Sequence, residues 1–237
     1  MRLWIWPIVR GYGLPGWKDS LVCCPDESHR MRLAGIVLLL LVPLLAADAI
    51  LTARGRFMGE FWASERDSKL DHIAGHPREW ARMGPVWVAM LAVATAGVSA
   101  LGVLLGRSGE GILAAIALGL FFPGVVSMLA TVFVLYGPVA VAAEARRDAG
   151  ATPGWLEPMW AGANRAEVSY IVLTGLAYIV FGIAMMRSVL PATWAAWAAV
   201  AIGALSVIGI IVSPARVGFP QLPLVVPILV GFALMTG

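Results

Sequence analysis

Apolar residues in this chain form long runs that contain no charged side chain. The longest run covers residues 111–143, GILAAIALGLFFPGVVSMLATVFVLYGPVAVAA. One helical crossing of a bilayer needs about 20 apolar residues, and two crossings need about 40 plus a turn. We therefore predict one long helix, kinked or broken at Pro123 and Pro138, because proline lacks the amide that a helix interior requires. Its end would project past the bilayer into the charged sequence AEARRDAG.

Five further apolar runs are separated by polar turns and loops. Together the runs predict an all-α transmembrane bundle of about six spans, near residues 33–51, 84–106, 111–143, 168–186, 191–212 and 217–237. The composition agrees, with 60% hydrophobic and 13% charged residues, against roughly 45–50% and 25% in soluble domains. We expect a multi-pass protein of a cell membrane, most simply a bacterial inner membrane, with the lipid bilayer as partner. The net charge of +3 is ordinary for such a protein and does not indicate nucleic-acid binding.

The beginning of the chain differs from the rest. Residues 1–30 are rich in tryptophan and show no helical or strand period, so we interpret them as an N-terminal extension, with Met31 as an alternative start. The alternative is a segment that lies on the membrane surface or on a partner, because tryptophan prefers the interface. Residues 47–49, Ala-Asp-Ala, resemble a signal-peptide cleavage site. The apolar run continues beyond them, which favours an uncleaved helix. Lys and Arg counted from Met31 place the two larger loops in the cytoplasm.

The loop of residues 53–83 carries apolar side chains at helical spacing among its charges: Phe57, Phe61, Trp62, Leu70 and Ile73. This pattern predicts an amphipathic helix near residues 57–74 that lies in the membrane interface. Gly75 would end it. Pro77 suits the first position of a new helix that continues into the second span.

One group of residues in this loop suggests metal chemistry. Histidines four apart on a helix can share a metal, and the candidate ligands are Asp71, His72, His76 and Glu79. The objection is local, because the residue before a proline is disfavoured in a helix and His76 precedes Pro77. All three histidines lie outside the spans, which disfavours haem between helices. We expect no cofactor.

Within the spans the candidate polar residues are Asp48, Tyr136 and Tyr178. An ionisable residue inside a membrane indicates function by default, although Asp48 stands near the end of its span. The spans otherwise lack charge, which counts against a coupled ion transporter. The chain contains no nucleophile elbow, zinc-protease motif or phosphate-binding loop.

Small residues recur at helical spacing along two spans, in the G-x-x-x-G step of Gly102 and Gly106 and in the series Ala195, Ala199 and Gly203. Such residues allow the close helix contact that replaces hydrophobic drive in lipid. We therefore expect a non-enzymatic accessory or scaffold subunit that meets other membrane subunits or itself. The alternatives are a transporter of small or lipid-like molecules and, third, a metal-dependent enzyme at the membrane surface.

Residues 76–80, His-Pro-Arg-Glu-Trp, stand just before an Ala/Leu/Gly-rich span. In this step and in its layout from residue 33 onward, the chain resembles six-helix bacterial membrane proteins of a domain of unknown function, which often show His-Pro-x-x-Trp before the second span. The resemblance implies a helical bundle and assigns no reaction.

Overall fold

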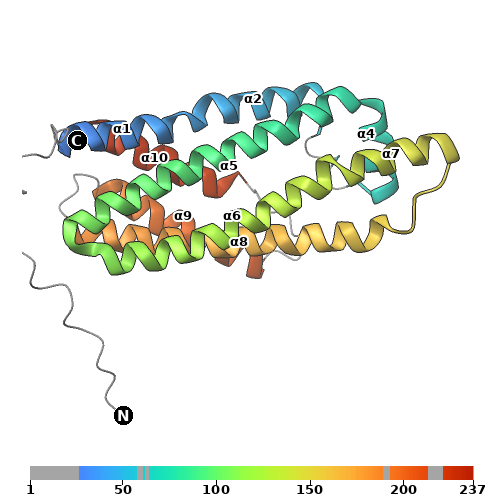
Figure 1. Ribbon diagram of the computed structural model, residues 1–237. Helices are drawn as coiled ribbons and strands as arrows, with labels where there is room; N and C mark the ends of the chain where they lie inside the picture. The colour runs from blue at the N-terminus through green and yellow to red at the C-terminus, as the bar shows by residue number, and fades with distance from the viewer. Residues whose placement is uncertain (1–26, 58–60, 62–63, 189–192, 213–220, 237) are drawn as a thin grey trace, which may run out of the picture.

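The computed structural model describes residues 27–57, 61, 64–188, 193–212 and 221–236, and every regular element within these ranges is helical. The elements are α1 (Glu27–Leu39), α2 (Leu41–Arg54), α4 (Arg66–Gly75), α5 (Pro77–Leu105), the π-turn η1 (Gly106–Glu110), α6 (Gly111–Tyr136), α7 (Pro138–Ala149), α8 (Leu156–Arg187), α9 (Thr193–Val212) and α10 (Leu222–Thr236). They form an elongated bundle in which α1 begins and α10 ends at the same end (Figure 1). The predicted all-α fold is confirmed for these residues. Most of the predicted N-terminal extension lies outside them.

The first predicted span consists of two helices, α1 and α2, that are separated at Leu40. Pro43 has no amide to give to the carbonyl of Leu39, so the helical ladder is interrupted there. Residues 47–49 lie inside α2 without a further break. At Gly35, α1 lies so close to α10 that a Cβ atom on this glycine would stand 2.8 Å from the carbonyl oxygen of Gly231.

The chain reverses between α5 and α6 in a tight turn. Gly109 has a φ of 95°, a left-handed value that glycine adopts without steric cost. The two helices then run side by side, as the short polar turn predicts. On their contact face, a Cβ on Gly102 would lie 2.8 Å from the Leu118 side chain.

The long helix predicted for residues 111–143 is continuous through Pro123 but broken at Pro138. Gly137 leaves the helical region with φ −107° and ψ −90°, and Pro138 starts α7 at the position where a missing amide does no harm. Across the break, the indole nitrogen of Trp80 donates a hydrogen bond to the carbonyl of Leu135 at 2.9 Å. A side chain from α5 thus stabilises the end of α6.

The backbones of the helices α8 and α9 approach each other closely through facing glycines. A Cβ on Gly203 would lie 2.5 Å from the carbonyl oxygen of Gly175, and Ala195 and Ala199 are buried on the same face of α9. The small residues predicted for close packing therefore contact other helices of this chain, except Gly106, which has nothing within 4 Å of a built Cβ.

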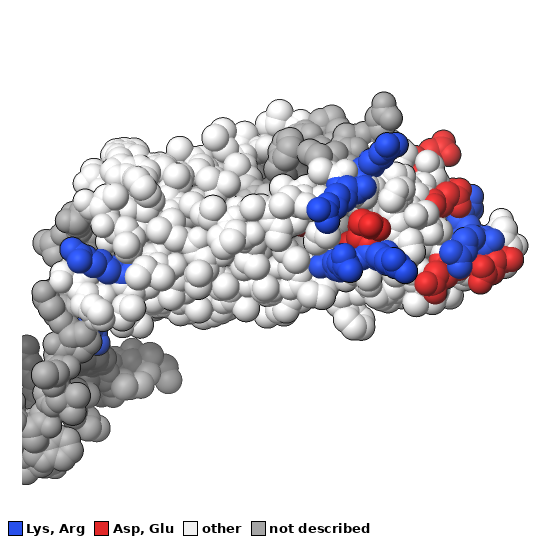
Figure 2. Space-filling view, turned by 90° about the horizontal axis from the view of Figure 1, so that it is seen from above, with Lys and Arg blue, Asp and Glu red and all other residues white. Residues whose placement is uncertain are grey.

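By length and composition, four helical runs among the described residues could cross a membrane: Ser28–Arg54, Pro77–Ala149, Leu156–Arg187 and Thr193–Val212. The second of these contains both arms of the α5–α6 hairpin. The apolar helix α10 is shorter, with 15 residues, so six spans are not confirmed. Figure 2 shows a long uncharged stretch between charged groups at the two ends of the visible face, as expected of a bundle in a bilayer.

At one end of the bundle, the helices α4 and α7 lie side by side over the starts of α5 and α8 (Figure 1). We call α4, α7, Phe57, Phe61 and the first turns of α5 and α8 the cap, and the rest of the bundle the belt. The cap has a core of its own, formed by Phe57, Phe61, Leu70, Ile73, Trp80, Met83, Val139, Ala142, Ala143 and Leu156. Within the region predicted to be an amphipathic helix, α4 covers Arg66–Gly75, and its apolar residues Leu70 and Ile73 are buried.

Candidate functional site

Asp48 is the one buried acid among the residues that the structure describes. It lies in the second half of α2, and 4% of its surface is exposed. The side chains of Trp87 on α5 and Gln221 just before α10 lie beside its carboxylate and can both donate hydrogen bonds. Within the described chain, the oxygen Oδ1 of Asp48 nevertheless has no hydrogen-bond partner. Buried polar atoms are almost always paired, so this atom is an exception that points to function.

Two more polar groups are linked to Asp48 through electrostatics. The carboxyl groups of Asp48 and Glu167 each act on the hydroxyl of Tyr136. Tyr136 belongs to the last turn of α6, and Glu167 to the first half of α8. We call these five residues the polar centre: Asp48, Trp87, Tyr136, Glu167 and Gln221.

The polar centre joins residues from four helices and one turn, and the sequence identified only two of them. Asp48 and Tyr136 were predicted as intramembrane polar residues. Glu167 lies just before the span predicted for residues 168–186, whereas α8 begins at Leu156 and carries it as a helical residue. Trp87 and Gln221 have no signal of their own, because tryptophan is common at the ends of spans and glutamine carries no charge.

Tyr178, the third predicted polar residue, lies elsewhere. It stands 11 residues after Glu167 on α8, which is about 16 Å along a helix. Its ring packs near Phe121, with 6.1 Å between the ring centroids. It also lines a small pocket whose other walls are apolar, among them Leu38, Val98 and Pro227. Tyr178 therefore belongs to the hydrophobic core of the belt.

The hydroxyl groups inside the belt bond to helix carbonyls. Thr131 donates to the carbonyls of Ser127 and Ala163, and Thr174 donates to the carbonyl of Tyr170 at 2.6 Å. Such bonds satisfy the hydroxyl within its own helix or with a neighbour. Thr131 therefore links α6 to α8, whereas the hydroxyl of Thr174 is satisfied within α8.

The residues predicted to bind a metal lie in the cap and at its edge. The Nε2 atom of His72 is 2.7 Å from the carbonyl oxygen of Gly55, and Nδ1 of His76 is 3.1 Å from the carbonyl oxygen of His72. The two rings stack with 4.6 Å between their centroids. Since backbone carbonyls accept, these nitrogens are the protonated donors. No group of three or more His, Cys, Asp or Glu side chains within the described ranges is arranged to hold a metal ion.

Asp71, another predicted ligand, is bound to an arginine. Arg146 on α7 holds both oxygens of Asp71 through Nε at 2.7 Å and a terminal nitrogen at 3.2 Å. It also contacts Asp67 at 3.0 Å and Thr152 at 3.0 Å. The hydrogen bond from Arg146 lowers the pKa of Asp71, because it stabilises the ionised carboxylate. Glu79 stays separate, in the first turn of α5.

Comparison of the chain with protein-family models, with curated proteins and with solved structures finds no match. The likeness at residues 76–80 thus rests on those residues and the layout alone.

Proposed function

We propose that this chain is a non-enzymatic membrane transport protein that passes protons or small cations through the belt, with Asp48 as the exchangeable carboxylate. The observation that carries this proposal is the unpaired Oδ1 atom of a carboxylate that is 4% exposed. An isolated charge in such surroundings costs several kcal/mol. A proton or a bound cation removes that cost, and its release restores it.

The position of Asp48 supports exchange with the cap side. It stands six residues before Arg54, where α2 ends, which is about 9 Å along the helix. Tyr136 and Glu167 are further groups of the polar centre that can accept or donate a proton. The short helix α10 starts directly after Gln221 and contains Pro227. A short helix that starts at a polar site resembles the half-helices that form substrate and ion sites in transporters.

The contacts inside the bundle also weaken the interpretation of the chain as an accessory subunit. That interpretation rested on small-residue stripes that could meet another protein. Gly203 instead faces Gly175, and Gly102 faces Leu118. With these surfaces used inside the chain, the main reason for a scaffold role is weaker. The surface-enzyme alternative is also weaker, because His72 and His76 bond to backbone carbonyls.

Reconstituted vesicles test the proposal. The purified protein is placed in liposomes that contain a pH-sensitive dye, and a potassium gradient with valinomycin drives protons inward. We expect proton flux through the unaltered protein and a loss of at least about tenfold in Asp48→Asn, because the amide cannot carry a proton under these conditions. Asp148→Asn is the matched control, since its carboxylate is 74% exposed at the end of α7.

Asp48→Asn also removes the cost of a buried charge, so we expect it to remain folded and at least as heat-stable in detergent. Equal proton flux in the two variants would contradict the role of Asp48. Protein-free and protein-containing vesicles that take up protons and sodium at the same rate would contradict the transport proposal as a whole.

A further inference from the structure

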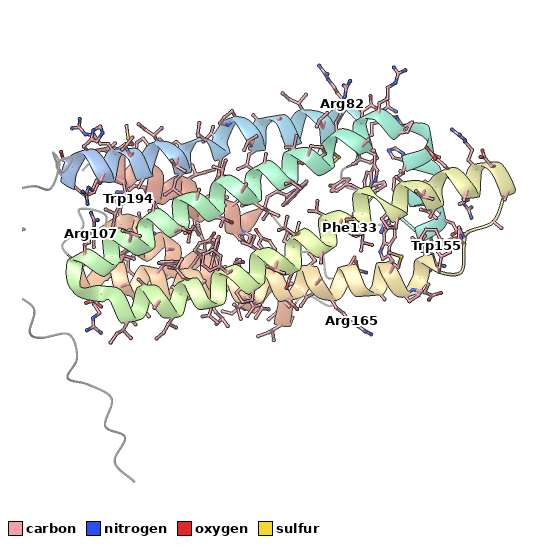
Figure 3. All side chains as sticks on the ribbon, in the orientation of Figure 1. Arg82, Arg107, Phe133, Trp155, Arg165 and Trp194 are labelled. Atoms are coloured by element: carbon pink, nitrogen blue, oxygen red, sulfur yellow. The ribbon has the colours of Figure 1, made fainter. Side chains whose placement is uncertain are left out.

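Four exposed arginines lie around the point where α2 ends and α5 begins. Arg54 is the last residue of α2, and Arg56 comes two residues later. Arg78 and Arg82 lie in the first two turns of α5. We call these four residues the basic patch. Figure 3 shows Arg82 pointing outward at the edge of the bundle that α2 and α5 form.

Packing in the cap holds the two halves of the basic patch together. The ring of Phe57, one residue after Arg56, lies 5.0 Å from the Trp80 ring and 6.1 Å from the His76 ring, centroid to centroid. The carbonyl of Gly55, one residue before Arg56, bonds to His72. The proximity of the arginines is therefore a consequence of buried contacts.

Arg56 has a backbone conformation that makes an arginine unexpected. Its φ is 53°, in the left-handed region, whereas Gly55 next to it has an ordinary right-handed φ of −80°. Residues other than glycine, asparagine and aspartate rarely adopt such a φ. The chain thus places a cation at a strained position on the surface.

The arginines of the basic patch have no ion pair within the described ranges, and the same holds for Arg30, Arg32, Arg107 and Arg165. Arg66, Arg146, Arg147 and Arg187 each form an ion pair with an acid. No ion pair or hydrogen bond from the side chains of the basic patch is found among the described residues. Glu79 is the acid that stands between Arg78 and Arg82 in sequence. It offsets one of the four positive charges and leaves an excess of three.

The basic patch lies where charged surface meets apolar surface. Figure 2 shows Lys and Arg side chains gathered at the edge of the uncharged stretch, on the face formed by α2 and α5. One turn deeper along α2 than Arg54 stands Ile50, which is 52% exposed, and farther along α5 than Arg82 stands Val88, which is 47% exposed. Guanidinium groups above exposed apolar side chains match the order of headgroup and acyl chain in a lipid.

We propose that the basic patch binds the phosphate headgroups of anionic phospholipids, with the acyl chains against the exposed apolar residues of α2 and α5. Guanidinium is planar and holds phosphate oxygens through two parallel hydrogen bonds. An anionic membrane surface also attracts clustered arginines at this depth. This binding site is independent of proton transport and does not require Asp48.

Native mass spectrometry of the full chain in nonionic detergent tests the proposal with dioleoyl phosphatidylglycerol and its zwitterionic counterpart, dioleoyl phosphatidylcholine. We expect the unaltered protein to retain the anionic lipid at least about tenfold more tightly, since each arginine near an anionic headgroup contributes roughly a fivefold change in affinity. The variant Arg54→Gln/Arg56→Gln/Arg78→Gln/Arg82→Gln should lose this preference.

Two further variants show whether lipid preference depends on the basic patch or only on the total positive charge of the protein. Changing Arg30, Arg32, Arg107 and Arg165 to Gln removes the same number of charges elsewhere and should leave the preference intact. Replacing the four residues of the basic patch with Lys should keep most of it. The proposal is overturned if both glutamine variants lose the preference equally, or if the unaltered protein retains the two lipids alike. Thermal stability in detergent identifies a variant that fails to fold, and the pairs Arg54→Gln/Arg56→Gln and Arg78→Gln/Arg82→Gln then replace it.

Discussion

The belt and the cap are parts of the same long helices, but different interactions hold them together. In the belt, backbones approach closely at glycines, as at Gly203 and Gly175, and hydroxyl groups bond to helix carbonyls. In the cap, aromatic rings fill a compact core around Phe57 and Trp80. Ion pairs of Arg146 with two aspartates join α4 to α7 above that core.

The difference is the one expected between a part in lipid and a part in water. In lipid, an apolar side chain gains nothing by leaving the solvent, so association depends on close contact and internal hydrogen bonds. In water, burial of apolar surface drives packing and charged groups can stay at the surface. The belt has the first set of features and the cap the second. Asp48 and the basic patch lie near the boundary between them.

The largest loss of stability is expected from Gly203→Leu in the belt. A Cβ at this position already meets the carbonyl oxygen of Gly175 at 2.5 Å and Ile179 at 3.0 Å. The added side chain must therefore separate α8 from α9. We expect a loss of about 3 kcal/mol or more of stability, at the upper end for overpacked positions. Thermal unfolding in detergent measures it.

Gly209→Leu is the matched control for that experiment. It lies on the same helix, and nothing stands within 4 Å of a built Cβ there. We expect little change, because no atom of the described chain stands in the way of the new side chain. Similar destabilisation by both changes would mean that α9 tolerates no leucine, and close contact at Gly203 would not be the cause.

A smaller effect is expected in the cap from Trp80→Phe. The phenyl ring keeps much of the packing but loses the hydrogen bond to the carbonyl of Leu135 at the α6–α7 break. An unsatisfied buried group costs about 1–3 kcal/mol. We expect faster trypsin cleavage after Arg146 and Arg147 in α7, with unchanged heat stability of the belt.

Trp155→Phe provides the comparison, since Trp155 is 43% exposed and belongs to neither core. It should leave the cleavage rate as it is. Loss of belt stability in Trp80→Phe would mean that belt and cap unfold as one unit, and the division between them would then describe geometry alone.

The helical character of the belt could be predicted from the sequence because its signal is local. A run of about 20 residues without charge predicts an apolar helix whatever it contacts, but six spans are not confirmed. Pro123 and Pro138 both predicted a bend or break. The helix continues through Pro123 and is broken only at Gly137, next to Pro138. The length of α10 could not be predicted, because the apolar run of residues 217–237 continues through its start.

The cap and the polar centre depend on contacts between distant residues, which a periodic pattern does not contain. The pattern in residues 57–74 predicts a helix with one apolar side. That side could be buried equally well in lipid or against a neighbouring helix, and the pattern does not distinguish the two. In the structure, Leu70 and Ile73 are buried in the cap core with α7. Likewise, the burial of Asp48 needs Trp87 and Gln221, which come from other parts of the chain.

The smallest effect is expected from acid on the contact between α4 and α7. Arg146 lowers the pKa of Asp71 below its usual value of 3.8, so the unfolded cap binds more protons than the folded cap in that range. The contribution of this pair is therefore complete above about pH 4 and is lost as the pH falls through the lowered pKa. Hydrogen exchange of α4 amides, corrected for the intrinsic rate, should rise as the pH falls from about 4 through the lowered pKa of Asp71, while exchange in α9 stays constant. Arg146→Gln should remove this pH dependence, whereas Arg147→Gln should retain it, because Arg147 pairs only with its neighbour Asp148 among the described residues. A pH response that survives in Arg146→Gln would assign the acid sensitivity of the cap to another group.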